Sequence, residues 1–181
     1  MQQVIVQKFG GTSVGSGERI AAVAEIIKKE AEINNVVIVV SAMAGETDRL
    51  IELSKQFGDN QNKREFDALI STGEKVSASL LAMALNSLGL KAKSYSAAQV
   101  SLKTTSNFSK AMILDIDKAK MEEILSDDSI PIITGFQGIT ETGEVTTLGR
   151  GGSDTTAVAI AASIKANRCD IYTDVDGIYT T

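Results

Sequence analysis

The stretch Val36-Val37-Ile38-Val39-Val40 consists of five consecutive β-branched residues. Such a continuous apolar run is typical of a central parallel strand that is covered on both faces. Val4–Phe9 is a second strand-like run, and the segment between the two carries apolar side chains at helical spacing, with Ser16 as its expected N-cap. The two runs therefore predict a strand–helix–strand unit.

The rest of the chain continues this alternation. Further strands are predicted at residues 91–96, 112–116, 130–136 and 170–175, and a hairpin at residues 139–147. Helices are predicted from Thr47 to about residue 57, after the polar break at residues 58–63, from Ser71 to Gly89, and at residues 117–125 and 153–166. This order predicts an α/β fold with a mostly parallel central sheet and helices on both of its faces.

Composition narrows the class of protein. The chain has 181 residues, 43% of them hydrophobic and 23% charged, which fits one ordinary soluble globular domain. The net charge of −5, without a basic patch, argues against nucleic acid as a partner. We expect no membrane span, because no apolar stretch approaches the ~18–20 residues required, and residues 1–7 do not resemble a secretory signal. Together with the single cysteine, this predicts a cytoplasmic location.

The sequence contains no histidine. This absence removes zinc sites that rely on histidine, as well as Ser–His and Cys–His catalysis. Phosphorylation of a carboxylate needs no imidazole, because a carboxylate with a pKa of ~4 is already ionised at pH 7.

Two glycine-rich segments lie near opposite ends of the chain, at Lys8–Val14 and Thr146–Asp154. Each follows a β-rich run and leads into a helix, so each offers free backbone N–H groups and a positive dipole end to a phosphate. Each also carries a cation, Lys8 or Arg150. Neither matches G-x-x-x-x-G-K-[ST] or G-x-G-x-x-G. The segments therefore predict a phosphoryl-transfer enzyme outside those two lineages.

Six segments, taken together and in order, resemble the aspartate kinases, within the amino-acid kinase family. They are Lys8–Val14, Val39–Ala42, Ser71–Glu74, Gly135–Ile139, Thr146–Ala157 and Cys169–Tyr179. The chain departs from the family at Ser96–Gln99, where many relatives carry a Gly-Trp-Gln segment. It also ends in a loop at Thr181, whereas the family continues through its nucleotide lobe and usually into regulatory ACT domains. We therefore expect a C-terminally incomplete catalytic domain that is inactive by itself.

The resemblance implies a three-layer α/β/α sandwich, with an aspartate-binding lobe at about residues 1–145 and the start of an ATP-binding lobe at about residues 146–181. It implies transfer of the γ-phosphoryl group of ATP to the β-carboxylate of L-aspartate, the first step towards lysine, threonine, methionine and diaminopimelate. Mg²⁺ would be held mainly by the ATP phosphates, without a dedicated metal site in the protein. The parent protein would be a homo-oligomer with no nucleic-acid or membrane partner.

The resemblance also assigns residues to the phosphate and the nucleotide. Lys8, otherwise a surface lysine, would contact the transferring phosphate, and Asp154, otherwise a helix residue favoured by the dipole, would organise the catalytic region. The remaining nucleotide contacts are Phe9, Gly10, Gly11 and Ser13 at the phosphates and Thr173, Asp174 and Tyr179 at the ribose and adenine.

On the substrate side, the resemblance gives Glu74 the α-ammonium and Arg150 the α-carboxylate of aspartate. From the residues alone, Glu74 would instead complete a capping box with Ser71, and Thr47 would cap a helix. By resemblance Thr47 also binds aspartate. The other expected substrate contacts are Ser41, Gly151, Gly152 and Ser153.

Two alternatives stay open. Another member of the amino-acid kinase family, such as a glutamate or uridylate kinase, would share the fold and the phosphate loops, although Glu74 and Arg150 favour an α-amino acid as the substrate. A chain of this length could instead be an inactive module for substrate binding or assembly.

Overall fold

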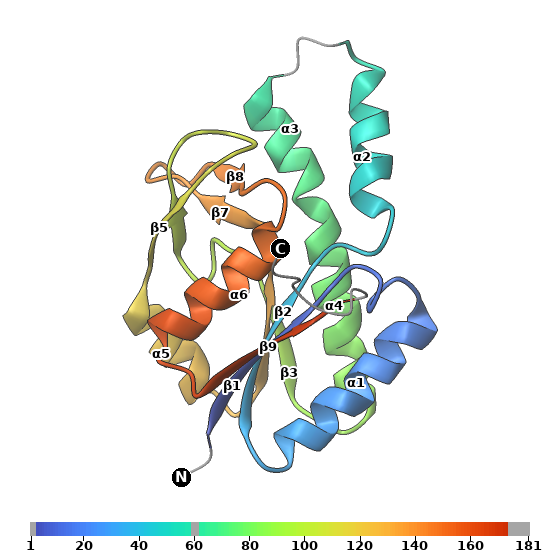
Figure 1. The fold of residues 1–181 in the computed structure, drawn as a ribbon, viewed down its shortest axis with the longest axis vertical. Coiled ribbons are helices and arrows are strands. Elements are labelled where there is room, and N and C mark those ends of the chain that lie inside the picture. The colour runs from blue at the N-terminus through green and yellow to red at the C-terminus, as the bar shows by residue number, and fades with distance from the viewer. Residues whose placement is uncertain (1–2, 59–61, 174–181) are drawn as a thin grey trace, which may run out of the picture.

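The computed structural model describes residues 3–58 and 62–173, and its centre is a five-stranded sheet (Figure 1). The strand order is β3-β6-β2-β1-β9, and every neighbouring pair is parallel. The strands are β1 (Val4–Phe9), β2 (Asn35–Val40), β3 (Ala92–Tyr95), β6 (Ile130–Thr134) and β9 (Arg168–Tyr172). The predicted run of β-branched residues lies in β2, the middle strand, so the parallel-sheet prediction is confirmed.

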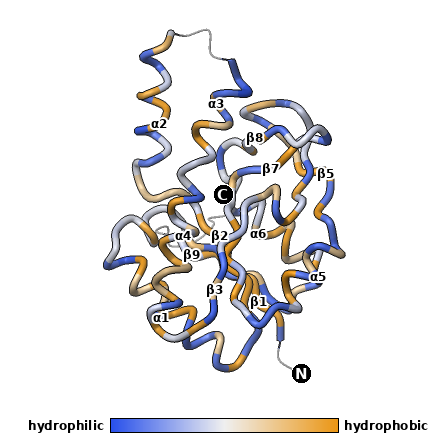
Figure 2. Tube along the Cα trace, turned by 180° about the vertical axis from the view of Figure 1, so that it is seen from behind, coloured by the Kyte–Doolittle hydropathy of each residue, from blue (hydrophilic) through white to orange (hydrophobic). Residues whose placement is uncertain are grey.

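Four helices cover the two faces of this sheet. They are α1 (Gly17–Ala31) and α4 (Thr72–Ser87) on one face, and α5 (Lys118–Ser126) and α6 (Gly152–Ser163) on the other. The side chains of β2 alternate between the two layers: Ile38 packs in the cluster that contains α1 and α4, and Val39 in the cluster that contains α5 and α6. Figure 2 shows hydrophobic residues gathered along the central strands. The predicted three-layer α/β/α sandwich is confirmed.

A second, four-stranded sheet was not predicted. Its order is β5-β4-β7-β8, with β4 (Leu102–Thr104), β5 (Ile113–Ile116), β7 (Gln137–Ile139) and β8 (Val145–Thr147). The strand predicted at residues 112–116 is present, but it pairs antiparallel with β4 instead of joining the central sheet. The predicted hairpin is β7–β8, closed by a hydrogen bond from the Thr140 N–H to the Glu144 carbonyl and by Gly143 at φ 84°.

Helices α2 (Glu46–Lys55) and α3 (Lys63–Ile70) project beyond the carboxyl ends of the central strands (Figure 1). Helix α3 runs into α4 through Ser71, which keeps helical angles (φ −67°, ψ −10°). The combined stretch Lys63–Ser87 is long and apolar enough to cross a membrane by length and composition, contrary to the expectation that no stretch approaches a span. Half of its most apolar window is buried inside the protein, and a single helix of this kind is weak evidence for a membrane span.

The parallel strands bring the ends of β1, β2 and β6 to one edge of the sheet. The Ser41 N–H donates to the Phe9 carbonyl over 3.1 Å, and the Gly135 N–H donates to the Val40 carbonyl over 2.9 Å. The loops that leave these strands therefore lie side by side at the carboxyl edge, where open α/β sheets bind their ligands.

Candidate active site

A pocket of about 550 Å³ lies at this carboxyl edge. It brings together nine of the residues predicted as site residues: Lys8, Ser41, Thr47, Glu74, Arg150, Gly151, Gly152, Ser153 and Asp154. These residues come from the ends of β1 and β2, the starts of α2, α4 and α6, and the loop between β8 and α6. All the residues predicted to bind aspartate thus line one pocket with the two predicted catalytic residues.

Lys8 is the last residue but one of the buried strand β1, and only 6% of the residue is exposed. A buried ammonium group is costly without a partner. Its Nζ lies 2.7 Å from Oδ1 of Asp154, in the first turn of α6. The contact is an ion pair without hydrogen-bond geometry, so Asp154 Oδ1 has no hydrogen-bond partner within residues 3–58 and 62–173. The pair keeps a cation at the floor of the pocket.

Glu74 lies in the first turn of α4 and is 3% exposed. Its Oε1 accepts a hydrogen bond from the Ala42 N–H over 3.1 Å, whereas Oε2 has no partner in the described part of the chain. Burial raises the pKa of this carboxyl to about 7, and backbone hydrogen bonds, including that from Ala42, only partly oppose the shift. A buried carboxylate with one unsatisfied oxygen is suited to receive a cationic group.

The capping-box interpretation of Ser71 and Glu74 is wrong. The Ser71 hydroxyl donates to the Ala68 carbonyl over 3.0 Å, and the Ser71 N–H donates to the Asp67 carbonyl. Because α3 leads directly into α4, Ser71 has a helical conformation and its N–H is already satisfied. Glu74 is therefore not needed as a cap and points its carboxylate to Ala42 and the pocket.

Arg150 lies in an exposed loop between two glycines with left-handed backbones, Gly149 at φ 81° and Gly151 at φ 71°. Gly151 is the N-cap of α6. A side chain at Gly152 would meet the ring of Phe136, because a Cβ there would lie 2.9 Å from Phe136 Cδ2. The loop therefore needs glycine for both its turns and its packing, and it presents the guanidinium at the mouth of the pocket.

The first glycine-rich loop packs tightly on the end of β2. A Cβ at Gly11 would lie 2.7 Å from the Ala42 carbonyl oxygen. The Gly10 N–H donates to the Tyr172 carbonyl and is not available to a phosphate, but the N–H groups of Gly11 and Thr12 have no hydrogen-bond partner among the described residues. Two backbone donors of this loop therefore remain available, as a phosphate-binding loop requires.

Other predicted nucleotide contacts do not line this pocket. The Phe9 ring is buried and stacked on Tyr172 with a centroid distance of 4.6 Å, and Ser13 lies in the turn that follows. Thr173 follows β9 and is exposed, while the predicted contacts Asp174 and Tyr179 lie outside the described residues. The nucleotide roles of these residues stay predictions, as does the division into lobes at residue 145.

Thr47 does not cap α2. The helix begins at Glu46, and its N-cap is Gly45 at φ 80°, without a side-chain hydrogen bond. Thr47 is thus already inside the helix, and its side chain contributes to the pocket wall.

Six further residues line the pocket and were not predicted from the sequence: Ala42, Asp48, Ile51, Ile70, Phe136 and Gly149. Phe136 is the most informative, because its φ of 67° is rare for a bulky residue and marks a constrained backbone. Its N–H donates to the Thr156 hydroxyl and its carbonyl accepts from the Leu148 N–H. The sequence contained one signal that could have identified Phe136: it is an aromatic residue directly after Gly135, the glycine that follows a strand.

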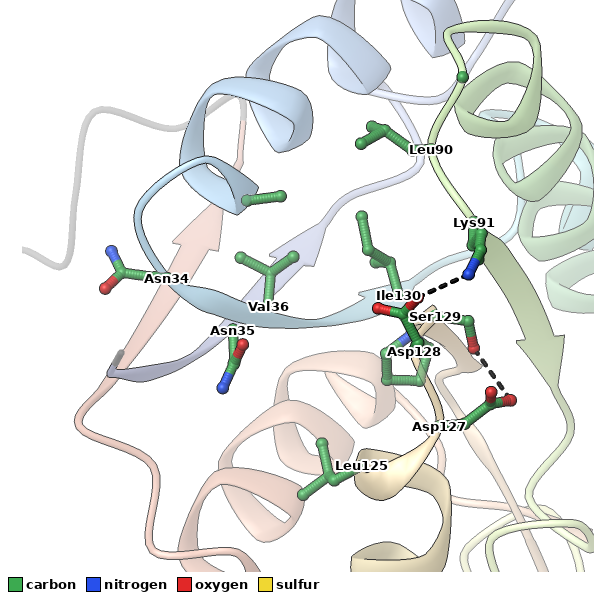
Figure 3. Close-up of a pocket in the computed structure, with 13 residues that line it drawn as sticks. Asn34, Asn35, Val36, Leu90, Lys91, Leu125, Asp127, Asp128, Ser129 and Ile130 are labelled. Carbon is green, nitrogen blue, oxygen red and sulfur yellow. Dashed lines mark hydrogen bonds and ion pairs between the residues drawn. The ribbon is translucent and has the colours of Figure 1, made fainter. Parts of the chain in front are cut away.

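A second hollow of about 420 Å³ lies at the opposite end of the sheet, where β2, β3 and β6 begin (Figure 3). Two pairs of its polar side chains contact each other: Lys91 Nζ lies 2.6 Å from Asp128 Oδ2, and the Ser129 hydroxyl donates to Asp127. Because its charges are exposed and mutually paired, this hollow has less to offer a ligand than the pocket at Glu74.

The pocket is lined by two cations, Lys8 and Arg150, and by three carboxylates, the exposed Asp48 and the two predicted site residues Glu74 and Asp154. This arrangement suits a zwitterionic substrate together with a phosphate group. Among residues 3–58 and 62–173, no three His, Cys, Asp or Glu side chains cluster in a way that could hold a metal ion.

Comparison with known proteins agrees with this geometry. The chain is 55% identical over 179 residues to the aspartate kinase of Pseudomonas putida and equally to an aspartokinase of Geobacillus stearothermophilus. Each match covers 98% of this chain and 44% of the relative, so the chain spans less than half the length of the curated relatives that it matches.

Solved structures give the same result. An aspartate kinase from Synechocystis superposes with a TM-score of 0.80 at 48% identity, over 94% of this chain and 28% of that one. E. coli aspartokinase III, in complex with aspartate and ADP, superposes with a TM-score of 0.83 at 28% identity, over 98% of this chain and 51% of that one. A model of the amino acid kinase family matches residues 3–181, and the chain therefore belongs to the amino acid kinase family.

Proposed function

We propose that the protein containing this chain is an aspartate kinase, which transfers the γ-phosphoryl group of ATP to the β-carboxylate of L-aspartate. One observation carries the proposal: the buried Glu74, whose Oε2 has no hydrogen-bond partner among residues 3–58 and 62–173, lines the same pocket as the cations Lys8 and Arg150. The similarity to aspartate kinases supports it.

The pocket can recognise both ends of an α-amino acid. Oε2 of Glu74 accepts hydrogen bonds from the α-ammonium group, which compensates the buried carboxylate. The planar guanidinium of Arg150 binds the α-carboxylate through two parallel hydrogen bonds. The side chain of the substrate then extends towards the remaining cation, Lys8. A nucleoside monophosphate such as uridylate has no ammonium group to bind Glu74, so it fits this pocket less well.

The transfer needs no general base, because the β-carboxylate is ionised at neutral pH. One of its oxygens forms a bond to the γ-phosphorus while the bond between that phosphorus and the β,γ-bridging oxygen breaks. The products are aspartyl phosphate, an acyl phosphate, and ADP. Lys8 and the free N–H groups of Gly11 and Thr12 stabilise the charge on the transferred group, and Asp154 keeps Lys8 oriented.

ATP is the proposed phosphoryl donor, in line with the ADP bound in the related E. coli enzyme. Mg²⁺ would accompany the nucleotide through its phosphates and neutralise part of their charge. A cytoplasmic location and a homo-oligomeric assembly are further parts of this proposal.

The test is a substrate panel with the full-length gene product. The protein is incubated with MgATP and L-aspartate, L-glutamate or UMP, and acyl phosphate is trapped with hydroxylamine while ADP release is followed in parallel. We expect hydroxamate only with L-aspartate. Hydroxamate with L-glutamate alone, or ADP release with UMP alone, would assign the protein to another member of the family. ADP release with none of the three would contradict a kinase function on this pocket.

A further inference from the structure

A second buried carboxylate, Asp67, lies one to two helical turns from the pocket and has no role in the chemistry described above. It belongs to α3 and is fully buried, with 0% of its surface exposed. Among residues 3–58 and 62–173, its carboxylate accepts four hydrogen bonds, and two residues donate all of them. Oδ2 accepts from the N–H groups of Ser109 and Thr147 over 2.8 and 2.7 Å, and Oδ1 accepts from their hydroxyls over 2.9 and 3.1 Å.

No cation pairs with Asp67 within the described residues. A buried carboxylate is expensive unless it is hydrogen-bonded, and here all of the compensation comes from two short segments that are distant in sequence. The side chain therefore fastens these segments to α3.

Thr147 is the last residue of β8, three residues before Arg150. Asp67 holds its N–H and its hydroxyl, and the Thr147 carbonyl accepts from the Ala111 N–H over 2.9 Å. Every polar group of Thr147 is thus fixed at the point where the Arg150 loop begins.

Ser109 supports the same loop from outside. Its backbone has a left-handed conformation with φ 68°, which is uncommon for serine and is maintained here by two hydrogen bonds to Asp67. The Ser109 carbonyl oxygen lies 3.5 Å from the position that a Cβ on Gly149 would occupy. Ser109 therefore packs directly against the residue that precedes Arg150.

Asp67 is connected to the other end of the substrate pocket through its own helix. The stretch Lys63–Ser87 is continuously helical, and Glu74 follows Asp67 by seven residues. Two helical turns separate the two side chains, about 10 Å along the axis, and both point to the same face of the helix. Gln137 makes a second connection to this helix. Its Nε2 donates over 2.9 Å to the carbonyl of Ser71, which lies between Asp67 and Glu74.

We propose that Asp67 is a positioning residue that sets the spacing between Glu74 and Arg150, and so fits the pocket to the length of its amino-acid substrate. This inference rests on the proposed function for the identity of that substrate. It makes Asp67 the link between the helix that binds the ammonium group and the loop that binds the carboxylate.

The test compares Asp67→Ala with Asp67→Asn in the full-length protein. Asparagine can keep the geometry, because its carbonyl oxygen accepts the two N–H groups while its amide donates to the two hydroxyls. We expect Asp67→Ala to raise the KM for L-aspartate at least about tenfold, as small misplacements of binding groups do, with the KM for ATP nearly unchanged. Asp67→Asn should restore most of the affinity for aspartate.

A readout independent of activity accompanies the kinetics. Amide hydrogen exchange, followed by mass spectrometry, should become at least about tenfold faster at Ser109 and at residues 147–152 in Asp67→Ala, because these amides lose their anchor. In Asp67→Asn it should stay close to that of the parent. If the parent makes no aspartyl phosphate, the proposed function fails, while the exchange data still decide whether Asp67 holds the loop.

The matched control is Asn86→Ala. Asn86 also fixes α4 by two side-chain hydrogen bonds, with the N–H and the carbonyl of Ala92 at the start of β3, but at the far end of the helix from the pocket. It should lower thermal stability without changing the KM for aspartate or the exchange at residues 147–152. If Asp67→Ala does not fold, Thr147→Val replaces it, because this variant removes only one of the four hydrogen bonds. The KM for aspartate and the exchange rates should then change in the same direction by about threefold.

Three results would overturn the inference. The first is an unchanged KM for aspartate in folded Asp67→Ala, or in Thr147→Val where it replaces that variant. The second is an equal rise in Asn86→Ala, which would show that any loss of stability has this effect. The third is an Asp67→Asn variant as impaired as Asp67→Ala in both kinetics and exchange, which would show that hydrogen-bond geometry is not what Asp67 supplies.

Discussion

Lys8 and Asp154 lie near opposite ends of the described chain, yet Nζ of the lysine is 2.7 Å from Oδ1 of the aspartate. The contact joins the end of β1 to the first turn of α6. The lysine side chain is 8% exposed and the aspartate side chain 50% exposed, so the lysine lies in the pocket floor and the aspartate on its rim. A phosphate oxygen that enters from the rim would meet a lysine already held in place by this contact.

Replacement of Lys8 by methionine should affect turnover more than binding. The substitution keeps the apolar part of the side chain near the end of β1. It removes the positive charge that we propose contacts the transferred phosphate. We expect kcat to fall by about 10²–10³, as with the loss of one oxyanion donor, while the KM for aspartate changes only a few-fold. Steady-state kinetics check this, with Lys29→Met, an exposed residue of α1, as the control. Equal turnover in Lys8→Met and the parent would reduce Lys8 to a structural residue.

Replacement of Arg150 by alanine should remove recognition of the α-carboxylate. A bidentate, charge-assisted contact contributes about 1.5–3 kcal/mol, so the KM for L-aspartate should rise by about 10- to 150-fold. ATP binding should persist, because the loop keeps its glycines. Arg49→Ala, which removes an exposed arginine paired with Glu46 on α2, is the control. A loss of ATP binding with unchanged aspartate affinity would contradict the assignment of Arg150.

The central sheet and much of the pocket could be predicted because their signals are local. The run Val36–Val40 is apolar on both faces, so it had to lie between two layers, and all five residues are buried. Parallel strands end at one edge of the sheet, and Lys8 and Ser41, which lie at the ends of two such strands, line one pocket.

The second sheet and Asp67 gave no such signal. Strand β4 has only three residues, Leu102–Thr104, and its parallel partner β7 is distant in sequence, so little in the local sequence distinguishes it from a loop. Asp67 has the appearance of a polar residue on a surface helix, and only the fold reveals that Ser109 and Thr147 surround it. The capping box at Ser71 failed for a related reason: the pattern was present, but a preceding helix already occupied the N–H.

Two glycine-to-alanine changes should have opposite effects. At Gly11 a methyl group would lie 2.7 Å from the Ala42 carbonyl oxygen, which belongs to the backbone and cannot easily move. Gly11→Ala should therefore destabilise the protein by about 1–3 kcal/mol and impair turnover, since it displaces the phosphate loop. At Gly17, the first residue of α1, nothing lies within 4 Å of the added methyl group. Gly17→Ala should be neutral or stabilising by up to about 1 kcal/mol. Denaturant unfolding of both variants checks the pair, and equal destabilisation would contradict it.

Glu74 should make the stability of the ligand-free protein depend on pH. Its pKa in the folded protein is about 7, above the ordinary value of 4.5, so between these values the folded state holds a proton that the unfolded state has released. Stability therefore falls as pH rises through this window, by up to about 3 kcal/mol in total. Glutamine is a neutral isostere of glutamate, so the stability of Glu74→Gln should match that of the parent near pH 4.5 and exceed it at pH 8. Chemical denaturation at both pH values measures this, with the exposed Glu141→Gln as the control. Parallel pH profiles for Glu74→Gln and the parent would refute the burial argument.

The same carboxyl should make aspartate binding depend on pH, because only the ionised form of Glu74 attracts an ammonium group. Below a pKa of about 7 the proton must leave before the substrate binds. The Kd for L-aspartate should therefore decrease about tenfold per pH unit from pH 5.5 towards pH 7 and level off above it. In Glu74→Gln the affinity should be weak and almost independent of pH over that range. Isothermal titration calorimetry gives both results, and it should show about one proton released per aspartate bound near pH 6 in the parent and none in the variant. A pH-independent Kd in the parent, without proton release, would show that the ammonium group of the substrate binds elsewhere.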